Sequence, residues 1–454
     1  MTFHQDALLQ LEAHFTHTQN EIVILYGDMQ NAPNDTLRTF LKNKNVFHYQ
    51  ARCCSDKLQL QFFHDEIREE LPKGMRMEMR YSEIISAMLS VSCEKRVIVI
   101  EEFQHFVKSD PSFMEELIRS IHNQWNNQKV MFLLTSSDKN WIEREMVTLL
   151  HDKAYEVRDV IALSEPDFSE CRAYFSDYDF QTAVEAYAVF GPYPGNWMRL
   201  DRSLTLQENI CRHVLTSGSY FHERGLRLLS KELREPAVYN TLLYALATGS
   251  NKLNELHKLT GFDRAKISVY LKNLIENSIV EKVESYDAPG HENVQKGVYR
   301  IIDPFTRFWF CFVFPHYSRL SEMDADKFYR KYIDAHLRTY AESAYVSVCR
   351  EYLIKQSVSA DQKEQFETTG AWHGKVGTID IIATTKQEKT IAAFCNFEKS
   401  RMSYADLEWN RYCLKQAKIT CEKIYLFSYA SFEEKLKKEA LSDPSLILID
   451  GDLQ

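Results

Sequence analysis

Residues 21–41 read EIVILYGDMQNAPNDTLRTFL, and this stretch decides the expected fold of the first third of the chain. The segment 21–26 is a short apolar run that ends at Gly27, which is typical of a buried strand. Leu37, Phe40 and Leu41 then fall on one face of a helix. A strand, a glycine and a helix in this order form the usual setting of a phosphate-binding loop.

The first third continues as alternating strands and helices. We expect strands at 46–50, 96–100 and 130–134, where short apolar or β-branched runs occur. Helical patterns at about 82–92 and 111–126 separate them. The continuous run RVIVI is typical of a parallel strand that is covered on both faces. The expected fold class is therefore α/β, with a parallel sheet between two layers of helices.

The loop after the first strand departs from the sequence that binds phosphate. Such a loop reads G-x-x-x-x-G-K-[ST], in which backbone N–H groups hold phosphates, the lysine neutralises charge and the hydroxyl holds magnesium. Gly27 stands at the first glycine. Ala32, Pro33 and Asn34 stand at the second glycine, the lysine and the hydroxyl residue. Proline is tolerated in the first helical turn, so the fold survives Pro33 while an amine and an N–H donor are lost.

This stretch resembles the bacterial and archaeal DEXX-box ATPase family, in which a strand precedes GRRRVGKT and a leucine-containing helix. The alignment needs no gap, and it implies a P-loop NTPase-like parallel sheet. The resemblance continues at RVIVIEEFQ (96–104), where the family has an apolar strand followed by DEF. Glu101 stands at the metal-linked aspartate, and Glu102 keeps the place of the general base that activates water.

Further positions of the same site differ from the family. Ser136 fits the polar sensor position, whereas Lys153 stands where the family has an arginine, and lysine lacks the bidentate fork that arginine offers phosphate. Asp28 and Asp35 add negative charge that would repel a triphosphate. We therefore expect a degenerate member that does not hydrolyse ATP. No cofactor is expected; ATP and magnesium would bind only to a remodelled loop.

The resemblance extends over most of the chain. YAVFGPYPGNWMRLD (187–201) is similar to the family's lid motif, and YRIIDPFTRFWFCFVFP (299–315) is similar to its most distinctive segment. The expected domains are a P-loop ATPase-like domain, a helical lid, a winged-helix domain and a restriction-endonuclease-like α/β domain, at 1–165, 166–235, 236–315 and 316–454.

The winged helix rests on helical patterns at 252–259 and 264–277, followed by wing strands at 280–285 and 297–302. The candidates for contact with DNA phosphates are Arg264, Lys266 and Lys272. Nearby acidic residues dilute this charge. A structural or protein-binding role for the winged helix therefore remains an alternative to DNA binding.

The C-terminal domain shows the same loss of reactive residues. Endonucleases of the resembled fold need an aspartate and then Glu-x-Lys on the next strand, where the acids bind magnesium. Asp380 matches the aspartate and Glu342 an acid on the preceding helix. Phe394 and Asn396 replace the glutamate and the lysine, and Thr378 replaces another frequent acid. Glu398 and Lys399 lie further along the expected strand, with Glu398 on the face of Phe394. Only a nuclease-like remnant is expected.

Composition limits the remaining possibilities. The chain has 454 residues and a formal net charge of -9, which disfavours a purely electrostatic nucleic-acid binder. The ten cysteines form no C-x-x-C pair and no Cys/His cluster of zinc spacing, so we expect no metal and a reduced, cytoplasmic protein. We expect no signal peptide, and no apolar run reaches the roughly 20 residues that span a membrane.

Two classes of function follow from these patterns. The first is a non-hydrolysing binding or regulatory scaffold derived from an ATPase. The second is a weak ATP-binding protein or slow ATPase that uses Glu102 and acts as a DNA-binding switch. DNA or a protein is the expected partner class, and the sequence leaves the oligomeric state open.

Overall fold

The computed structural model describes residues 4–17, 19–27, 35–72, 77–90, 95–123, 130–146, 156–163, 165–228, 235–286, 297–359 and 365–453. The chain divides into two compact units. Unit 1 comprises Met1–Pro166 with Tyr193–Gly195, and unit 2 comprises Asp167–Pro192 with Asn196–Gln454. No described helix is both long and apolar enough to cross a membrane.

Unit 1 is built on a five-stranded parallel sheet in the order β2-β3-β4-β1-β5. This sheet and its flanking helices match the P-loop NTPase fold, which confirms the expected fold class. The first strand of the chain lies between β4 and β5, so its end is surrounded by neighbouring strand ends. The strand bounds are β1 Glu21–Tyr26, β2 Asn45–Gln50, β3 Arg96–Glu101, β4 Val130–Ser136 and β5 Val157–Ala162.

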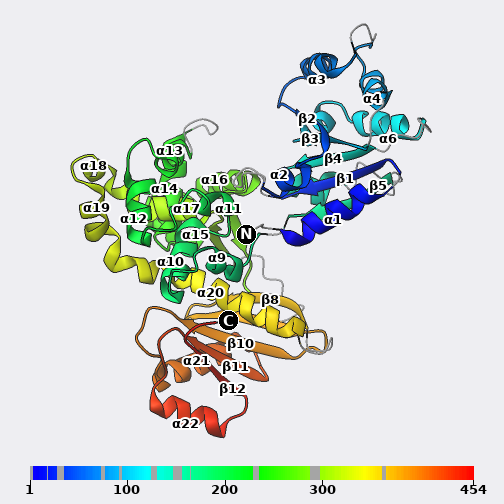
Figure 1. Cartoon of the computed structure of the whole chain (residues 1–454). Coiled ribbons are helices and arrows are strands. Elements are labelled where there is room, and N and C mark those ends of the chain that lie inside the picture. Colours follow the sequence, from blue (N-terminus) through cyan, green and yellow to red (C-terminus); the bar gives the residue numbers. More distant parts are fainter. Residues whose placement is uncertain are drawn as a thin grey trace. The chain divides into compact units, whose positions relative to one another are not determined.

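Helices cover both faces of this sheet because its inner strands β3, β4 and β1 are buried on both sides (Figure 1). Val23 and Leu25 of β1 pack with α1 and α2, whereas Ile22 and Ile24 face the core formed with α3 to α6. The bounds are α1 Gln5–Thr16, α2 Asp35–Leu41, α3 Asp56–Glu70, α4 Tyr81–Ser90, α5 Gln104–Ser109, α6 Phe113–Asn123, α7 Lys139–Trp141 and the π-helix η1 Ile142–Met146.

Unit 2 begins with helices that surround a buried apolar segment. Phe305, Phe308 and Trp309 of that segment are each at most 2% exposed, so the run at 305–314 is a core helix. The bounds are α9 Phe168–Tyr174, α10 Phe180–Phe190, α11 Pro194–Trp197, α12 Leu206–Ile210, η3 Cys211–Leu215, α13 Tyr220–Arg227, α17 Pro304–Phe308, η4 Trp309–Val313, η5 Phe314–His316, α18 Tyr317–Leu320 and α19 Ala325–Tyr332.

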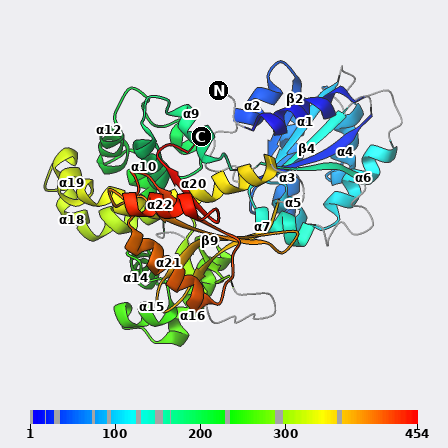
Figure 2. The same cartoon turned by 90° about the horizontal axis from the view of Figure 1, so that it is seen from below.

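Three helices and a two-stranded antiparallel sheet form the arrangement expected of a winged helix. Figure 2 shows α14, α15 and α16 grouped together. The turn between α15 and α16 contains Gly261 at φ 73°, a left-handed conformation that ends α15. The bounds are α14 Pro236–Ala247, α15 Leu253–Thr260, α16 Arg264–Glu276, β6 Val280–Val283 and β7 Val298–Ile301.

The C-terminal part of unit 2 is a second, mixed sheet in the order β12-β11-β10-β9-β8. The long helix α20 packs on β9 and β10, and α21 and α22 contribute to the core on the other face (Figure 1). The bounds are α20 Asp334–Ser359, β8 Phe366–His373, β9 Thr378–Thr385, β10 Thr390–Asn396, α21 Tyr404–Ala417, β11 Lys423–Ser428, α22 Glu434–Ser442 and β12 Leu446–Asp450.

Candidate functional site

Gly27 lies at the carboxyl end of β1, where a phosphate-binding loop would begin. Its backbone N–H donates to the carbonyl oxygen of Ser136 at 3.2 Å. A Cβ atom at this position would lie only 2.7 Å from the Cβ of Leu163. Close packing against the segment after β5 is therefore sufficient to require glycine here, without any phosphate. Ala32, Pro33, Asn34 and Lys153 lie outside the described residues.

Glu102 directly follows β3 and adopts φ 54°, a conformation that is rare for residues with a side chain. One of its carboxylate oxygens, Oε2, accepts hydrogen bonds from the hydroxyl of Ser137 at 2.7 Å and from the amide of Gln104 at 2.5 Å. A general base needs a lone pair directed at its water. In this structure the chain's own donors occupy that oxygen.

Glu101 is paired on the neighbouring strand. Its Oε1 lies 2.9 Å from Nε2 of His48 on β2. The hydrogen bond with Glu101 is the main cause that raises the pKa of His48. The carboxylate expected at the metal-linked position thus has an imidazole partner.

Ser136 is completely buried at the end of β4. Its hydroxyl accepts the backbone N–H of Asp138 at 3.1 Å. Strand β4 lies between β1 and β3 in the sheet. Ser136, at the end of β4, therefore lies between the end of β1, which carries Gly27, and the end of β3, which carries Glu101. The structure therefore gathers these predicted residues at the carboxyl edge of the sheet, where ligands of parallel α/β proteins bind.

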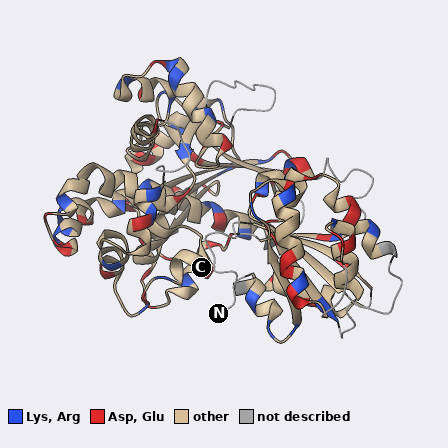
Figure 3. Ribbon diagram, turned by 90° about the horizontal axis from the view of Figure 1, so that it is seen from above, with Lys and Arg blue, Asp and Glu red and all other residues tan. Residues whose placement is uncertain are grey.

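The predicted DNA-contact residues lie on α16 and make local contacts. Arg264 donates to the side-chain oxygen of Asn254 at 2.9 Å, and Lys272 lies 3.7 Å from Glu276. The ammonium group of Lys266 lies 5.0 Å from the centre of the Phe262 ring. Figure 3 shows Lys and Arg interspersed with Asp and Glu along the helices. Helix α16 thus carries all three positively charged side chains, but acidic side chains such as Glu276 lie beside them.

Glu342 and Asp380 are brought together beside the end of β10. Both carboxylate oxygens of Glu342 accept the backbone N–H of Phe397, at 3.1 and 3.0 Å, and one also accepts that of Glu398. Asp380 accepts the backbone N–H of Cys395 at 2.9 Å. Burial raises the pKa of Glu342 to about 7 and that of Asp380 to about 6. Each carboxyl is therefore engaged by main-chain donors.

Asn396 contributes to packing at the same strand end. Its amide donates to the hydroxyl of Ser428 at 3.2 Å and to the carbonyl of Lys399 at 3.3 Å. The ammonium group of Lys399 lies 2.7 Å from Asp406. Strand β10 ends at Asn396, so the expected alternation does not extend to Glu398. The strand stops there because the next two N–H groups bond to the Glu342 side chain instead of a neighbouring strand.

The distinctive segment at 299–315 has a structural role in unit 2. Asp303 caps α17 by accepting the backbone N–H of Thr306 at 3.0 Å, with Pro304 in the first turn. The same carboxylate pairs with Arg224 at 2.8 Å. Arg224 also donates to Asn196, which belongs to the lid-like segment 187–201. Arg224 thus links the segments 187–201 and 299–315, which both resemble segments of the family.

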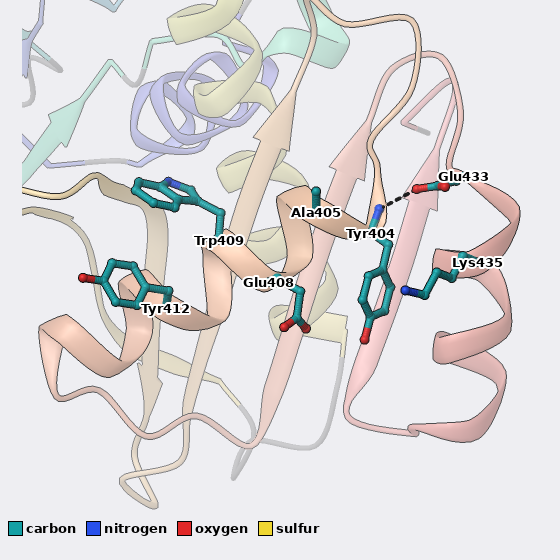
Figure 4. Close-up of a pocket in the computed structure, with 7 residues that line it drawn as sticks. All are labelled: Tyr404, Ala405, Glu408, Trp409, Tyr412, Glu433 and Lys435. Carbon is teal, nitrogen blue, oxygen red and sulfur yellow. Dashed lines mark hydrogen bonds between the residues drawn. The ribbon is translucent and has the colours of Figure 1, made fainter.

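A pocket of about 610 Å³ lies beside α21 and was not foreseen from the sequence. Figure 4 shows Tyr404, Glu408, Trp409 and Tyr412 on α21, with Lys435 opposite on α22. The backbone N–H of Tyr404 donates to Glu433 at 2.8 Å, and the Lys435 ammonium group lies 3.6 Å from the Tyr404 ring centre. The aromatic residues Tyr404, Trp409 and Tyr412 within this short segment were the available signal in the sequence.

The family described as "Archaea bacterial proteins of unknown function" matches residues 309–407. An uncharacterized protein of Methanocaldococcus jannaschii is 24% identical over 298 residues, and the match spans 65% of each chain. These findings support the resemblance to an archaeal and bacterial protein family.

Solved structures with related architecture include two archaeal proteins. The Walker-type ATPase of Pyrococcus abyssi has 13% identity and a TM-score of 0.40, covering 68% of this chain and 96% of the ATPase. The ORC2 protein of Aeropyrum pernix, in its ADPNP and ADP complexes, has 12% identity and a TM-score of 0.41. This match covers 72% of this chain and 93% of the ORC2 chain.

Proposed function

We propose that this chain is a cytoplasmic binding or regulatory scaffold that keeps a P-loop NTPase-like sheet and does not hydrolyse ATP. The observation that carries the proposal is the proline at position 33, where the phosphate-binding sequence requires lysine. Lysine supplies a positive charge to the phosphates, and its backbone supplies an N–H donor. Proline supplies neither.

The hydrogen bonds of the strand ends support the same conclusion. Glu102 would have to release Ser137 or Gln104 before its Oε2 oxygen could orient a water molecule. Oε1 of Glu101 would have to release His48 before this oxygen could bind a metal ion. Each exchange costs hydrogen bonds, and bonds to a charged group contribute roughly 1.5–3 kcal/mol.

The hydrogen bonds in the C-terminal sheet of unit 2 also support a scaffold role. The carboxylates of Glu342 and Asp380 hold the backbone around β10, and Lys399 pairs with Asp406. A metal-dependent nuclease needs acids that are free to bind magnesium and a lysine near the reacting phosphate. The proposal therefore assigns these acids to the packing of the sheet.

Calorimetric titration of the full-length chain with ATP and magnesium tests the proposal. We expect no micromolar, magnesium-dependent binding and no ATP turnover above that of a heat-denatured sample. Micromolar binding that depends on magnesium, with turnover that Glu102→Gln abolishes, would replace the scaffold by a slow ATPase.

A DNA-binding switch is the second candidate, and the winged-helix arrangement favours it. Arg264, Lys266 and Lys272 lie on α16, which is the second helix of the helix-turn-helix and the element that such domains place in the major groove. A mobility-shift assay at low and then higher salt tests this candidate, because contacts with phosphates weaken as salt rises. If the mobility of DNA is still shifted after these three residues are changed to glutamine, this helix is excluded as the DNA-contact surface.

A further inference from the structure

Two histidines and two carboxylates come together where the end of α1 meets the sheet of unit 1. Nδ1 of His14 lies 2.8 Å from Oε2 of Glu21, and Nδ1 of His17 lies 2.6 Å from Oε1 of the same carboxylate. Nε2 of His14 lies 3.1 Å from Oδ2 of Asp159 on β5. Ligand atoms of His14, His17 and Glu21 all lie within 4.8 Å of one another.

We propose that His14, His17 and Glu21 form a binding site for one zinc-class divalent metal ion, with Asp159 orienting His14. Imidazole nitrogen and carboxylate oxygen are the ligands that Zn²⁺ takes, and sites with two histidines and one glutamate leave a fourth position for water. The expectation from the sequence that the chain holds no metal is replaced by this proposal. The signal in the sequence that this expectation overlooked is the spacing H-x-x-H-x-x-x-E over residues 14–21.

The role of each group follows from the atoms that already face one another. His14 directs Nδ1 at Glu21 and its other ring nitrogen at Asp159, so one nitrogen can bind the metal while the other donates to a carboxylate. This carboxylate–histidine–metal arrangement is usual around zinc because it fixes the tautomer and the orientation of the ring. Two carboxylates also balance the two positive charges of the ion.

Each imidazole–carboxylate pair has to move only slightly for the ion to enter. Bonds of about 2.0–2.1 Å in tetrahedral geometry place neighbouring ligand atoms roughly 3.3 Å apart. The two imidazole–carboxylate distances of 2.8 and 2.6 Å would therefore grow by about half an ångström. The His17 side chain is 44% exposed and can make that shift, while the Glu21 side chain is 7% exposed and fixed on β1.

The surroundings hold the backbone of the site in place. The ammonium group of Lys95 donates to the carbonyl oxygen of His17 and lies 3.5 Å from that of His14. Ala7 and Leu11 anchor α1 in the apolar core next to β1 (Figure 1). A bound ion would join the end of α1, β1 and β5, so the proposed site fastens the first helix to the sheet.

Zinc titration of the chelator-treated, full-length chain tests the proposal, and Co²⁺ serves as an absorbing probe. We expect one high-affinity ion per chain and the visible spectrum of tetrahedral cobalt with nitrogen and oxygen ligands. His17→Gln should weaken Zn²⁺ binding at least tenfold, and Asp159→Asn should weaken it roughly 10- to 100-fold. His336→Gln, which changes an exposed histidine in unit 2, should leave the affinity unchanged.

Several outcomes would overturn the site. No Zn²⁺ binding to the wild-type chain would overturn it, as would equal affinity of the wild type and His17→Gln. A cobalt–thiolate charge-transfer band would place the metal on the free cysteines instead. Circular dichroism of His17→Gln should match that of the wild type because this side chain is half-exposed, so loss of binding reports the ligand and not the fold.

Discussion

The hydroxyl of Ser137 donates a hydrogen bond of 2.7 Å to the Glu102 carboxylate, which stands at the general-base position of the resembled ATPases. Ser137 follows β4 and Glu102 follows β3, and these strands are neighbours in the sheet. The contact satisfies a carboxylate whose backbone is held at φ 54°. It makes this acid part of the packing at the ends of β3 and β4.

Restoring the phosphate loop should create ATP binding. In the triple variant Ala32→Gly, Pro33→Lys and Asn34→Thr, the charged amine and hydroxyl are returned on an unchanged sheet. Charged hydrogen bonds contribute roughly 1.5–3 kcal/mol, so the affinity for magnesium ATP should rise by about 10- to 100-fold. Calorimetry measures the change. Pro33→Ala is the matched control, because it returns the N–H without the amine. A triple variant that binds no better than the control would contradict the loop explanation.

Gly27→Ala should destabilise unit 1 even without nucleotide. The added Cβ would lie 2.7 Å from the Cβ of Leu163 and 3.0 Å from its carbonyl oxygen. Overpacking of this kind costs about 1–3 kcal/mol. Urea unfolding measures the loss. Gly249→Ala is the control for backbone strain alone, because Gly249 has φ +99° and open space around it. Wild-type stability in Gly27→Ala would show that the glycine is free of this packing constraint.

The stability contributed by Glu342 and Asp380 should fall as pH rises from about 4 to about 7. Burial raises the pKa of Glu342 to about 7 from 4.5 and that of Asp380 to about 6 from 3.8. The folded protein therefore keeps protons that the unfolded chain has released, and the stabilisation present at low pH is lost as pH rises through the folded-state values. One pKa unit corresponds to about 1.4 kcal/mol, so the expected effect is on the order of a few kcal/mol.

The neutral variant Glu342→Gln separates this contribution from the rest of the protein. Its amide oxygen can still accept one backbone N–H, but it binds no proton. Urea unfolding at pH 5 and pH 8 should show a smaller stability difference than in the wild type. Glu422→Gln, at an exposed position, should keep the wild-type difference. An unchanged pH dependence in Glu342→Gln would remove this carboxyl as its source.

Asp303→Asn should destabilise unit 2 by about 3 kcal/mol. Asp303 caps α17 and balances Arg224, whose side chain is 17% exposed. Removing one partner of a largely buried ion pair leaves the other charge uncompensated, which costs roughly 3–5 kcal/mol when the pair is fully buried. Thermal unfolding measures the effect. Asp263→Asn is the control, because Asp263 caps α16 at an exposed position without such a pair. Equal effects of the two variants would assign the cost to capping alone.

The sequence by itself determined the elements that carry their own periodicity. The apolar run at 21–26 is β1 as expected, and the helical pattern at about 82–92 corresponds to α4 Tyr81–Ser90. The strand at 96–100 lies inside the parallel sheet between β2 and β4, because the β-branched run at 97–100 contains no polar residue and can only be covered on both faces. These local patterns were sufficient to predict the fold class.

Only the tertiary structure decided the edge strands and the partners of the site residues. Strand β5 contains Arg158 and Asp159, and β8 has only two buried residues, so neither shows the apolar run of a central strand. Pairing with a neighbouring strand defines both. His14 meets Asp159 across 145 residues of chain, and Glu342 meets Phe397 across 55. Hydrogen bonds between groups so distant in sequence depend on how the layers pack, and no local periodicity encodes that packing.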